Sequence, residues 1–323
     1  MSSLKEIKTR IGSVNNTRKI TSAMKMVASS KLHHAQRMIE NMYPYATLLK
    51  GMLKTFLQAE VDVESDLVRE RQEVKRIAII AFSSNSSMCG GYNNNVIKLT
   101  MQVAEEYAHL GKENILIYPV GRKIAEKVTK LGYKPAGHFV QLADKPNAQQ
   151  CAEIAREVSD MYRNHEIDRV ELIFHHFKSA GSQILTRDTL LPIDLEKELD
   201  KNIYRDLTST VTTKDAQDYI RENGSNEQKS EKVKAFEVKD YYLIEPDRET
   251  VLSTLIPKVI NLQVYVALLD SNASEHAARM VAMQTATDNA DELLRQLNLQ
   301  YNKSRQQAIT SELLDIVGGS INN

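Results

Sequence analysis

The sequence predicts a long helix at each end of the chain, with the two helices lying against each other and an α/β domain of mostly parallel sheet inserted between them. Both ends carry apolar residues at alternating spacings of three and four, the pattern of a coiled coil. Between the ends, short β-branched apolar runs alternate with helical segments. Ordinary amphipathic helices of an all-α domain are the alternative, and the length of the two terminal runs favours the paired helices.

The first helix is predicted from Leu4 to Phe56. Steps of three and four along this stretch reach sixteen positions, of which thirteen are apolar. The three polar positions are consecutive in this series: Arg18, Thr21 and Lys25. Pro44 removes one backbone donor inside the helix, so we expect a bend near Tyr43.

The last helix carries the same pattern from Leu252 to Ser311, where fourteen of eighteen positions are apolar. No Gly or Pro occurs between residues 258 and 317, so 60 residues can continue as one helix of roughly 90 Å. Pro257 lies early in this run and marks either a kink or the true start of the helix.

The helix ends carry capping signals. Ser2 or Ser3 can cap the first helix, and Glu6 is placed to complete a capping box. Gly318 and Gly319 follow the last apolar position of the second helix, and we expect that helix to stop there.

The middle of the chain has a different period, which indicates a βα alternation. The predicted strands are Arg76–Ser83, Ile115–Val120 and Arg169–Phe177, with a weaker strand at His138–Leu142 and an edge strand at Gln183–Arg187. The predicted helices are Asn94–Leu110, Arg122–Leu131 and Asn147–Asn164. Right-handed crossovers between parallel strands follow from this order.

The domain boundaries follow from these patterns. Residues 1–57 and 248–318 are predicted to form the coiled coil, and residues 74–195 the α/β domain. Residues 206–235 are predicted to be a flexible polar excursion, because the stretch RENGSNEQKSEKVK contains a single apolar residue, Val233. A regulatory role for this excursion is a hypothesis that deletion of Thr208 to Lys232 tests.

Composition excludes several classes of protein. The chain has 42 basic and 42 acidic residues, so bulk attraction to nucleic acid or to an anionic membrane is not supported. Residues 1–40 nevertheless hold eight Lys or Arg against two Glu, which makes the first helix basic. Cys89 and Cys151 suit a reducing compartment rather than a disulfide scaffold. The sequence has neither a signal-peptide pattern nor a run of 18 apolar residues.

Motifs for chemistry are absent from the sequence. It contains no GxxxxGK[ST], GxGxxG, HExxH or CxxC, so no cofactor and no metal are expected. The turn Cys89-Gly90-Gly91 follows the first strand, where it is either an anion-binding loop or, more simply, a turn that requires glycine. The adjacent pairs His33-His34 and His175-His176 point in different directions and do not share a metal. No catalytic residue is predicted.

Motifs at both ends resemble the gamma subunit of F-type ATP synthase. The residues that carry the resemblance are Ser13–Ala28 (SVNNTRKITSAMKMVA), Ser274–Met283 (SEHAARMVAM), Thr285–Ala290 (TATDNA), Tyr301–Glu312 (YNKSRQQAITSE), Ile316–Gly319, Cys89-Gly90-Gly91 and Glu245-Pro246. One departure precedes the glycine turn. Asn85, Ser86 and Ser87 stand where the family often has an acidic residue, a basic residue and a glycine.

The resemblance implies a rotating central shaft. In this family the terminal helices form an antiparallel coiled coil inside a ring of alpha and beta subunits, and the α/β domain meets the epsilon subunit and the membrane c-ring. The delta subunit completes the expected set of partners. Ion flow, of protons or sodium, turns the shaft and drives ATP synthesis on the beta subunits. The implied location is the cytoplasmic side of the cell inner membrane, as a peripheral protein without nucleic acid.

The resemblance also implies residue roles. Residues expected to face the beta subunits are Met24, Lys25, Arg279, Arg305, Gln306, Thr310 and Glu312. Ile316 and Val317 match the apolar tip in the upper bearing. Residues expected at the foot, near epsilon and the c-ring, are Lys31, Tyr241, Tyr242 and Glu245. For each of them, packing within the helix pair or simple solvation is the alternative.

Two other functions remain open from the sequence. One is a non-catalytic coiled-coil scaffold with an α/β head, which predicts stable partners but no rotation. The other is a small α/β hydrolase or transferase that uses the Cys89 turn, which requires a ligand for the middle segment.

Overall fold

The computed structural model describes residues 4–57, 65–71, 73–194, 245 and 247–321. These residues divide into two compact units. Unit 1 contains residues up to Ser30 together with those from Arg279 onward, and unit 2 contains Lys31–Ala278. The predicted excursion at 206–235 and the capping residues Ser2 and Ser3 lie outside the described residues, and the predicted domain boundaries stay predictions.

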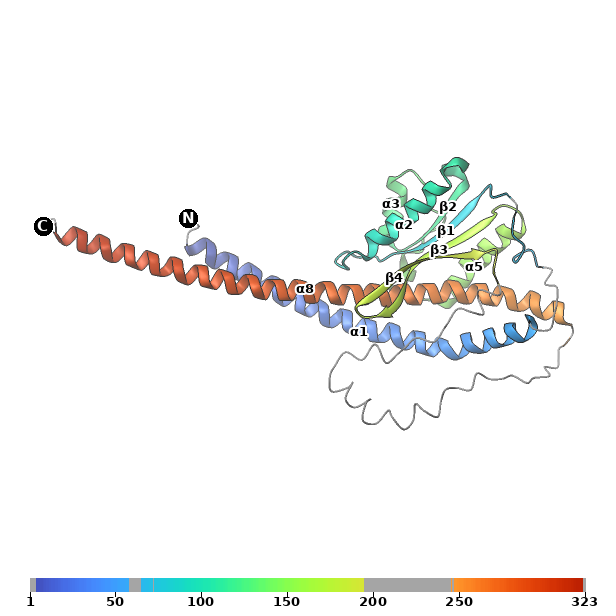
Figure 1. The fold of residues 1–323 in the computed structure, drawn as a ribbon, viewed down its shortest axis with the longest axis horizontal. Coiled ribbons are helices and arrows are strands. Elements are labelled where there is room, and N and C mark those ends of the chain that lie inside the picture. The colour runs from blue at the N-terminus through green and yellow to red at the C-terminus, as the bar shows by residue number, and fades with distance from the viewer. Residues whose placement is uncertain (1–3, 58–64, 72, 195–244, 246, 322–323) are drawn as a thin grey trace, which may run out of the picture. The chain divides into compact units, whose positions relative to one another are not determined.

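Two long helices contribute to both units. Helix α1 spans Leu4–Leu57 and helix α8 spans Arg248–Ile321, as Figure 1 shows. Both predicted helices are therefore confirmed. Pro44 lies inside α1.

The ends of α8 differ from the prediction. The helix begins nine residues before Pro257, because Asp247 accepts hydrogen bonds from the backbone N–H and the hydroxyl of Thr250, both at 2.8 Å. Pro257 is thus not the start of the helix. The expectation that α8 stops at Gly318 and Gly319 is also wrong, since the helix continues to Ile321. Glycine permits a left-handed stop but does not impose one.

In unit 1 the two helices run antiparallel, as the resemblance implied. Thr21 and Thr287 share a hydrogen bond of 2.8 Å between their hydroxyls, and three residues earlier on α1, Arg18 contacts Asp291 at 3.1 Å. A residue earlier in α1 therefore meets a residue later in α8. Apolar heptad positions are buried between the helices: Ile7, Ala28, Met283, Ala290 and Leu297.

Unit 2 contains a four-stranded mixed sheet in the order β2-β1-β3-β4. The strands are β1 (Ile77–Phe82), β2 (Ile115–Val120), β3 (Arg169–Ser179) and β4 (Ser182–Leu191). Strand β1 pairs in parallel with β2 and β3, and β4 pairs antiparallel with β3. The mostly parallel sheet and the edge strand are therefore confirmed.

Helices cover both faces of this sheet. They are α2 (Tyr92–Glu106), α3 (Arg122–Lys130), α4 (Val140–Asp144) and α5 (Ala148–Arg163), with short 3₁₀ turns η1 (Ala108–Leu110) and η2 (Lys112–Asn114). The weak strand predicted at His138–Leu142 is wrong, because α4 occupies this position. Leu142 and Ala143 are adjacent and both buried, whereas neighbours on an edge strand point to opposite faces.

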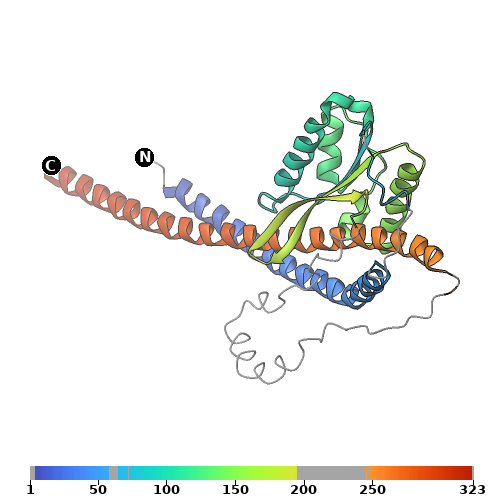
Figure 2. The ribbon, with the colours of Figure 1, turned by 45° about the vertical axis from the view of Figure 1, so that its right-hand side comes forward.

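The core of unit 2 has two layers, one on each face of the sheet. Alternate residues of β1 divide between them: Ile77 and Ile79 face α2 and α3, while Ile80 and Phe82 face α5, α8 and α1. Figures 1 and 2 show α2 and α3 on one side of the sheet and α5 and α8 on the other. This placement explains why the central strands are apolar on both faces.

Helix α8 is also apolar and long enough to cross a membrane, judged by length and composition alone. Half of the qualifying 18-residue window is buried inside the protein. Residues of α8 from Leu252 to Leu268 contribute buried side chains to the core of unit 2.

Candidate functional site

The loop after β1 is a turn that needs glycine at one position. Gly90 has φ of 58°, in the left-handed region, and Gly91 precedes the first turn of α2. Met88 also has a positive φ, 64°, although it is not glycine. The sequence predicted the positive φ of Gly90 and missed that of Met88, because glycine is the residue type that commonly adopts a left-handed backbone conformation.

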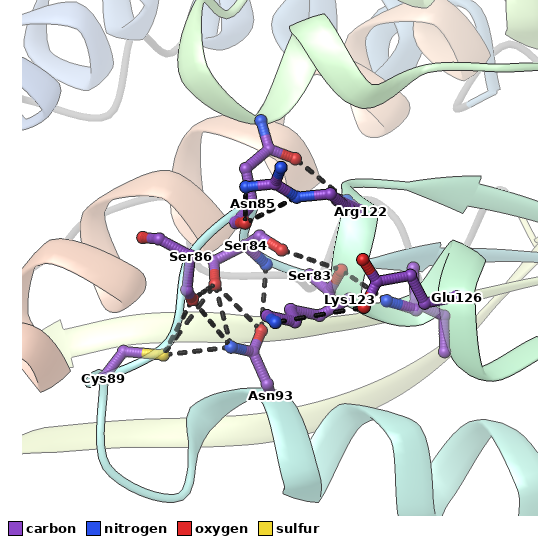
Figure 3. A network of polar contacts seen from close by, with 10 residues as sticks. Ser83, Ser84, Asn85, Ser86, Cys89, Asn93, Arg122, Lys123 and Glu126 are labelled. Atoms are coloured by element: carbon purple, nitrogen blue, oxygen red, sulfur yellow. Dashed lines mark hydrogen bonds and ion pairs between the residues drawn. The ribbon is translucent and has the colours of Figure 1, made fainter.

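A network of hydrogen bonds joins the residues of this turn to one another and to Asn93 at the start of α2 (Figure 3). The side chain of Asn93 accepts from Ser84 N–H at 3.0 Å and donates to the Ser86 carbonyl at 3.2 Å and to Cys89 Sγ at 3.1 Å. Cys89 is buried, and the hydrogen-bond partners of its thiol within the described residues are Ser84, Ser86 and Asn93. No His or carboxylate is among them, so the described site offers no general base to this thiol.

Asn85 joins three elements at the same place. Its side-chain amide donates to the Val140 carbonyl at 2.8 Å and to Asp144 Oδ2 at 2.7 Å, and its side-chain oxygen accepts from Arg122 N–H at 2.9 Å. These bonds tie the end of β1 to the start of α3 and to α4. Asn85 thus has a structural role that the sequence did not reveal, since its partners lie 37 to 59 residues away.

The two histidine pairs lie in different surroundings. The described residues hold no group of three or more His, Cys, Asp or Glu that could bind a metal. His33 and His34 are exposed on α1. His175 is buried and stacks on Tyr92 at 4.6 Å, and burial lowers its pKa to about 4. His176 Nδ1 lies 2.6 Å from Asp270 Oδ2.

A buried acid on β3 is neutralised within the chain. Glu171 contacts Arg187 and Arg169, and Arg187 also pairs with Glu106 at 2.7 Å. Hydrogen bonds to Glu171 raise the pKa of Arg187, and burial opposes this effect. Two guanidinium groups meet two carboxylates, so the formal charges of this cluster balance and its contacts link β3, β4 and α2.

The residues expected to face the beta subunits all lie on helices of unit 1. Met24 and Lys25 are half-buried on α1, and Arg279 is half-buried on α8. The remaining four are exposed on α8: Arg305, Gln306, Thr310 and Glu312. Thr310 donates its hydroxyl to the Gln306 carbonyl at 2.9 Å, within the helix.

The other predicted residues are only partly described. Ile316 and Val317 lie in α8, and their side chains lie outside the described residues, as do Tyr241 and Tyr242. Lys31 and Glu245 are exposed. These positions neither support nor oppose the predicted contacts at the bearing and the foot.

Unit 1 has exposed apolar side chains that the heptad pattern does not include. On α1, Met26 is 66% exposed, and Ile20 and Val27 are exposed as well. On α8 the corresponding residues are Leu299, Ile309, Leu313 and Leu314. Their signal in the sequence was available, since they are apolar residues outside the coiled-coil positions.

Known proteins resemble this chain along its whole length. A family model described as ATP synthase matches residues 3–321. The chain is 53% identical over 321 residues to the ATP synthase gamma chain of Bacteroides thetaiotaomicron, covering 99% of this chain and 100% of that protein. The chain belongs to the ATP synthase gamma-chain family. The gamma chain of Desulfitobacterium hafniense is 37% identical, with 99% of each chain covered.

Chains in two solved structures of mitochondrial ATP synthases share the fold. A chain of the Euglena gracilis mitochondrial ATP synthase has a TM-score of 0.58 at 17% identity, covering 98% of this chain and 92% of that one. A chain of the Tetrahymena thermophila central stalk and c-ring has a TM-score of 0.53 at 24% identity, covering 83% of this chain and 99% of that one.

Membership of the gamma-chain family confirms the resemblance stated from the end motifs. As a member, the chain is a subunit of ATP synthase, a membrane-associated complex. The alternative of an unrelated coiled-coil scaffold is not favoured, because full-length relatives carry the gamma-chain name.

Proposed function

We propose that this chain is the central-stalk rotor subunit of an F-type ATP synthase and has no catalytic site of its own. It couples ion flow through the membrane c-ring to ATP synthesis on the beta subunits by rotation. The observation that carries the proposal is the full-length similarity to ATP synthase gamma chains. The antiparallel helix pair of unit 1 supports it, because such a pair is a stiff element suited to transmit a turn.

The coupling is mechanical. A rotor acts on the beta subunits only through contacts that differ between their states, because a binding partner shifts an equilibrium by its differential affinity. Unit 1 offers two kinds of exposed side chain for such contacts. The exposed apolar side chains include Met26 on α1 and Leu299 on α8, and the exposed polar side chains include Arg305 and Gln306 on α8.

The polar break in the α1 heptad pattern has a mixed role in this proposal. Two of its three residues are used inside the helix pair, since Thr21 bonds Thr287 and Arg18 pairs with Asp291. Lys25 remains as the residue of this series proposed to face a beta subunit, beside Met24. Arg279, Arg305, Gln306, Thr310 and Glu312 complete the proposed beta-facing set.

The remaining contacts follow the same assignment. Ile316 and Val317 are proposed to sit in the upper bearing of the alpha–beta ring. Lys31, Tyr241, Tyr242 and Glu245 are proposed to meet epsilon and the c-ring, with delta as a further subunit of the complex. These partners hold the chain peripherally on the cytoplasmic side of the inner membrane. The proposed domains are a shaft of residues 1–57 and 248–318 and an α/β domain of residues 74–195.

Reconstitution tests the proposal. The full chain is mixed with alpha and beta subunits of a related ATP synthase, and complex formation and ATP hydrolysis are followed. We expect a complex with one copy of this chain and steady hydrolysis that depends on it. If alpha and beta neither bind the chain nor respond to it, the rotor assignment fails.

Two matched variants sharpen the result. Arg305→Ala removes an exposed beta-facing charge and is expected to lower hydrolysis or coupling in the complex. Arg295→Ala, on the same helix and also exposed, serves as the control, because Arg295 contacts Glu292 within α8 and is not in the proposed set. Equal effects of the two variants contradict the assignment of Arg305.

A further inference from the structure

Helix α8 carries a polar stretch in a place where an apolar helix is expected. Residues Asp270–His276 are all buried in unit 2, and Ala273 is the single apolar residue among them. The stretch is flanked by the buried apolar residues Leu269 and Ala277. Burying polar side chains costs free energy unless each finds a partner, so this composition needs a reason other than stability.

Four hydrogen bonds connect this stretch to the α/β domain. Asp270 Oδ2 lies 2.6 Å from His176 Nδ1, and the Ser274 hydroxyl donates to the His175 carbonyl at 3.1 Å. Asn272 donates to the Ala143 carbonyl at 2.8 Å, and the Tyr92 hydroxyl donates to the Ser271 carbonyl at 3.0 Å. The partners come from β3, from α4 and from α2. We name these four contacts the α8 clamp.

The clamp contacts lie on two different sides of α8. Asp270 and Ser274 are four residues apart, so they share one face of α8, and both contact β3. Asn272 is two residues from each, which is about 200° around the helix, and it contacts α4. A grip on two sides opposes both rotation of α8 about its own axis and sliding along it.

Helix α1 meets the same domain differently. It contributes the buried apolar residues Ala46, Leu49 and Leu53 to the core on this side of the sheet. Apolar contacts are non-directional and tolerate repacking, whereas hydrogen bonds specify one arrangement. The hydrogen bonds of the clamp therefore fix the position of α8 against the α/β domain. The apolar contacts of α1 stabilise the packing without fixing its position.

The clamp also costs stability, which indicates that it is retained to fix the position of α8. Two buried polar atoms beside it, Ser271 Oγ and His175 Nδ1, have no hydrogen-bond partner within the described structure. An apolar stretch of the same shape avoids that cost. Buried polar groups retained at a cost are best attested as devices that fix register.

We infer that the α8 clamp makes the α/β domain and helix α8 turn as one body, so that torque applied to the domain enters the shaft through α8. Helix α8 continues from the clamp into unit 1, which begins at Arg279. The clamp residues are positioning residues, since they act through α8 and touch neither nucleotide nor ions. The inference rests on the proposed rotor function.

The test uses the assembled ATP synthase in inverted membrane vesicles. The clamp variant Tyr92→Phe/Asn272→Leu/Ser274→Ala replaces three of the four contacts with groups of similar shape. Such replacements are compatible with folding, because apolar residues of similar volume often substitute for buried polar ones. The quantity measured is the number of coupling ions, protons or sodium, pumped per ATP hydrolysed, which a purely structural role does not change.

We expect the clamp variant to assemble and hydrolyse ATP while its pumping per ATP falls by roughly twofold or more, because each lost hydrogen bond shifts the balance toward a displaced arrangement about fivefold. The control is Thr100→Val/Ser159→Ala. It removes two buried hydroxyl contacts that stay within α2 and α5, and it should pump normally.

Each outcome decides something. Unchanged pumping per ATP in the clamp variant overturns the clamp, and so does an equal loss in the control. If the clamp variant does not assemble, Ser274→Ala and Tyr92→Phe are measured singly, and normal pumping in both overturns it equally. If the unmodified chain supports no pumping that depends on it, the rotor function itself fails, which separates the two proposals.

Discussion

Helix α8 has two very different surroundings along its length. Over Ala267–Ala277, in unit 2, every residue is buried, including six polar ones. Over residues 298–314, in unit 1, most residues are exposed, and Leu299 is 67% exposed. The same helix thus serves as a core element at one place and as an open surface at another. The difference teaches that the polarity of a residue does not by itself predict its burial on α8. Six polar residues are buried in the first stretch, and apolar residues such as Leu299 are exposed in the second.

The largest effect comes from a matched pair of leucines on α8. Leu268→Ala removes a buried side chain from the core of unit 2 and should cost about 3 kcal/mol of unfolding free energy. Leu299→Ala truncates an exposed one and should cost less than about 0.5 kcal/mol. Urea unfolding of the full chain, followed by circular dichroism, measures both. Equal losses would show that the exposed stretch is packed within the chain.

The second effect is a pH dependence from His175. Its folded pKa is about 4 and the ordinary value is 6.5, so between these values the unfolded chain binds a proton that the folded chain does not. The free energy of unfolding therefore decreases as pH falls from 6.5 to about 4, and the full decrease, reached below pH 4, is about 3 kcal/mol. His175→Gln should flatten this part of the pH profile of the urea midpoint.

The control for that profile is His33→Gln, since His33 is exposed on α1. This variant should keep the pH profile of the unmodified chain. A profile that stays equally steep in His175→Gln would mean that other groups cause the loss.

The third effect concerns the departure from the family pattern at Asn85. Asn85→Asp places a carboxylate beside Asp144, at the position of a 2.7 Å hydrogen bond. We expect a loss of about 1–2 kcal/mol at pH 7, because the hydrogen bonds from the Asn85 amide to the Val140 carbonyl and to Asp144 are both lost and the second is replaced by like-charge repulsion.

A double-mutant cycle separates that repulsion from other effects of the substitution. Adding Asp144→Asn to Asn85→Asp should recover the part of the loss that comes from the repulsion, with a coupling of about 1 kcal/mol between the two positions, while the lost bond to the Val140 carbonyl is not restored. Additive effects of the two substitutions would mean that the contact does not persist in solution. Urea unfolding of all four chains provides the measurement.

The smallest effect is expected from the ion pair of unit 1. Arg18 and Asp291 are about half exposed, so Asp291→Asn should cost less than about 1 kcal/mol, and less still at high salt. Asp288→Asn is the control, since Asp288 contacts Gln284 on its own helix. A larger loss for Asp291→Asn, insensitive to salt, would show that this ion pair between the helices is shielded from solvent.

Some features of this protein were determined by the sequence alone. The heptad spacing predicted both long helices, because a helical period of 3.6 residues is a local property that a stretch of chain carries by itself. The β-branched runs at Ile77–Phe82 and Ile115–Val120 predicted their strands for the same reason, and the end motifs placed the chain in its family.

Other features were decided only by the tertiary structure. The short run at His138–Leu142 is too brief for its period to distinguish a strand from helix α4. The polar break at Arg18 and Thr21 is satisfied by Asp291 and Thr287, more than 260 residues away. The burial of Asp270–His276 likewise depends on partners from β3, α4 and α2. Polar groups are buried where remote partners meet them, and a local pattern contains no record of those partners.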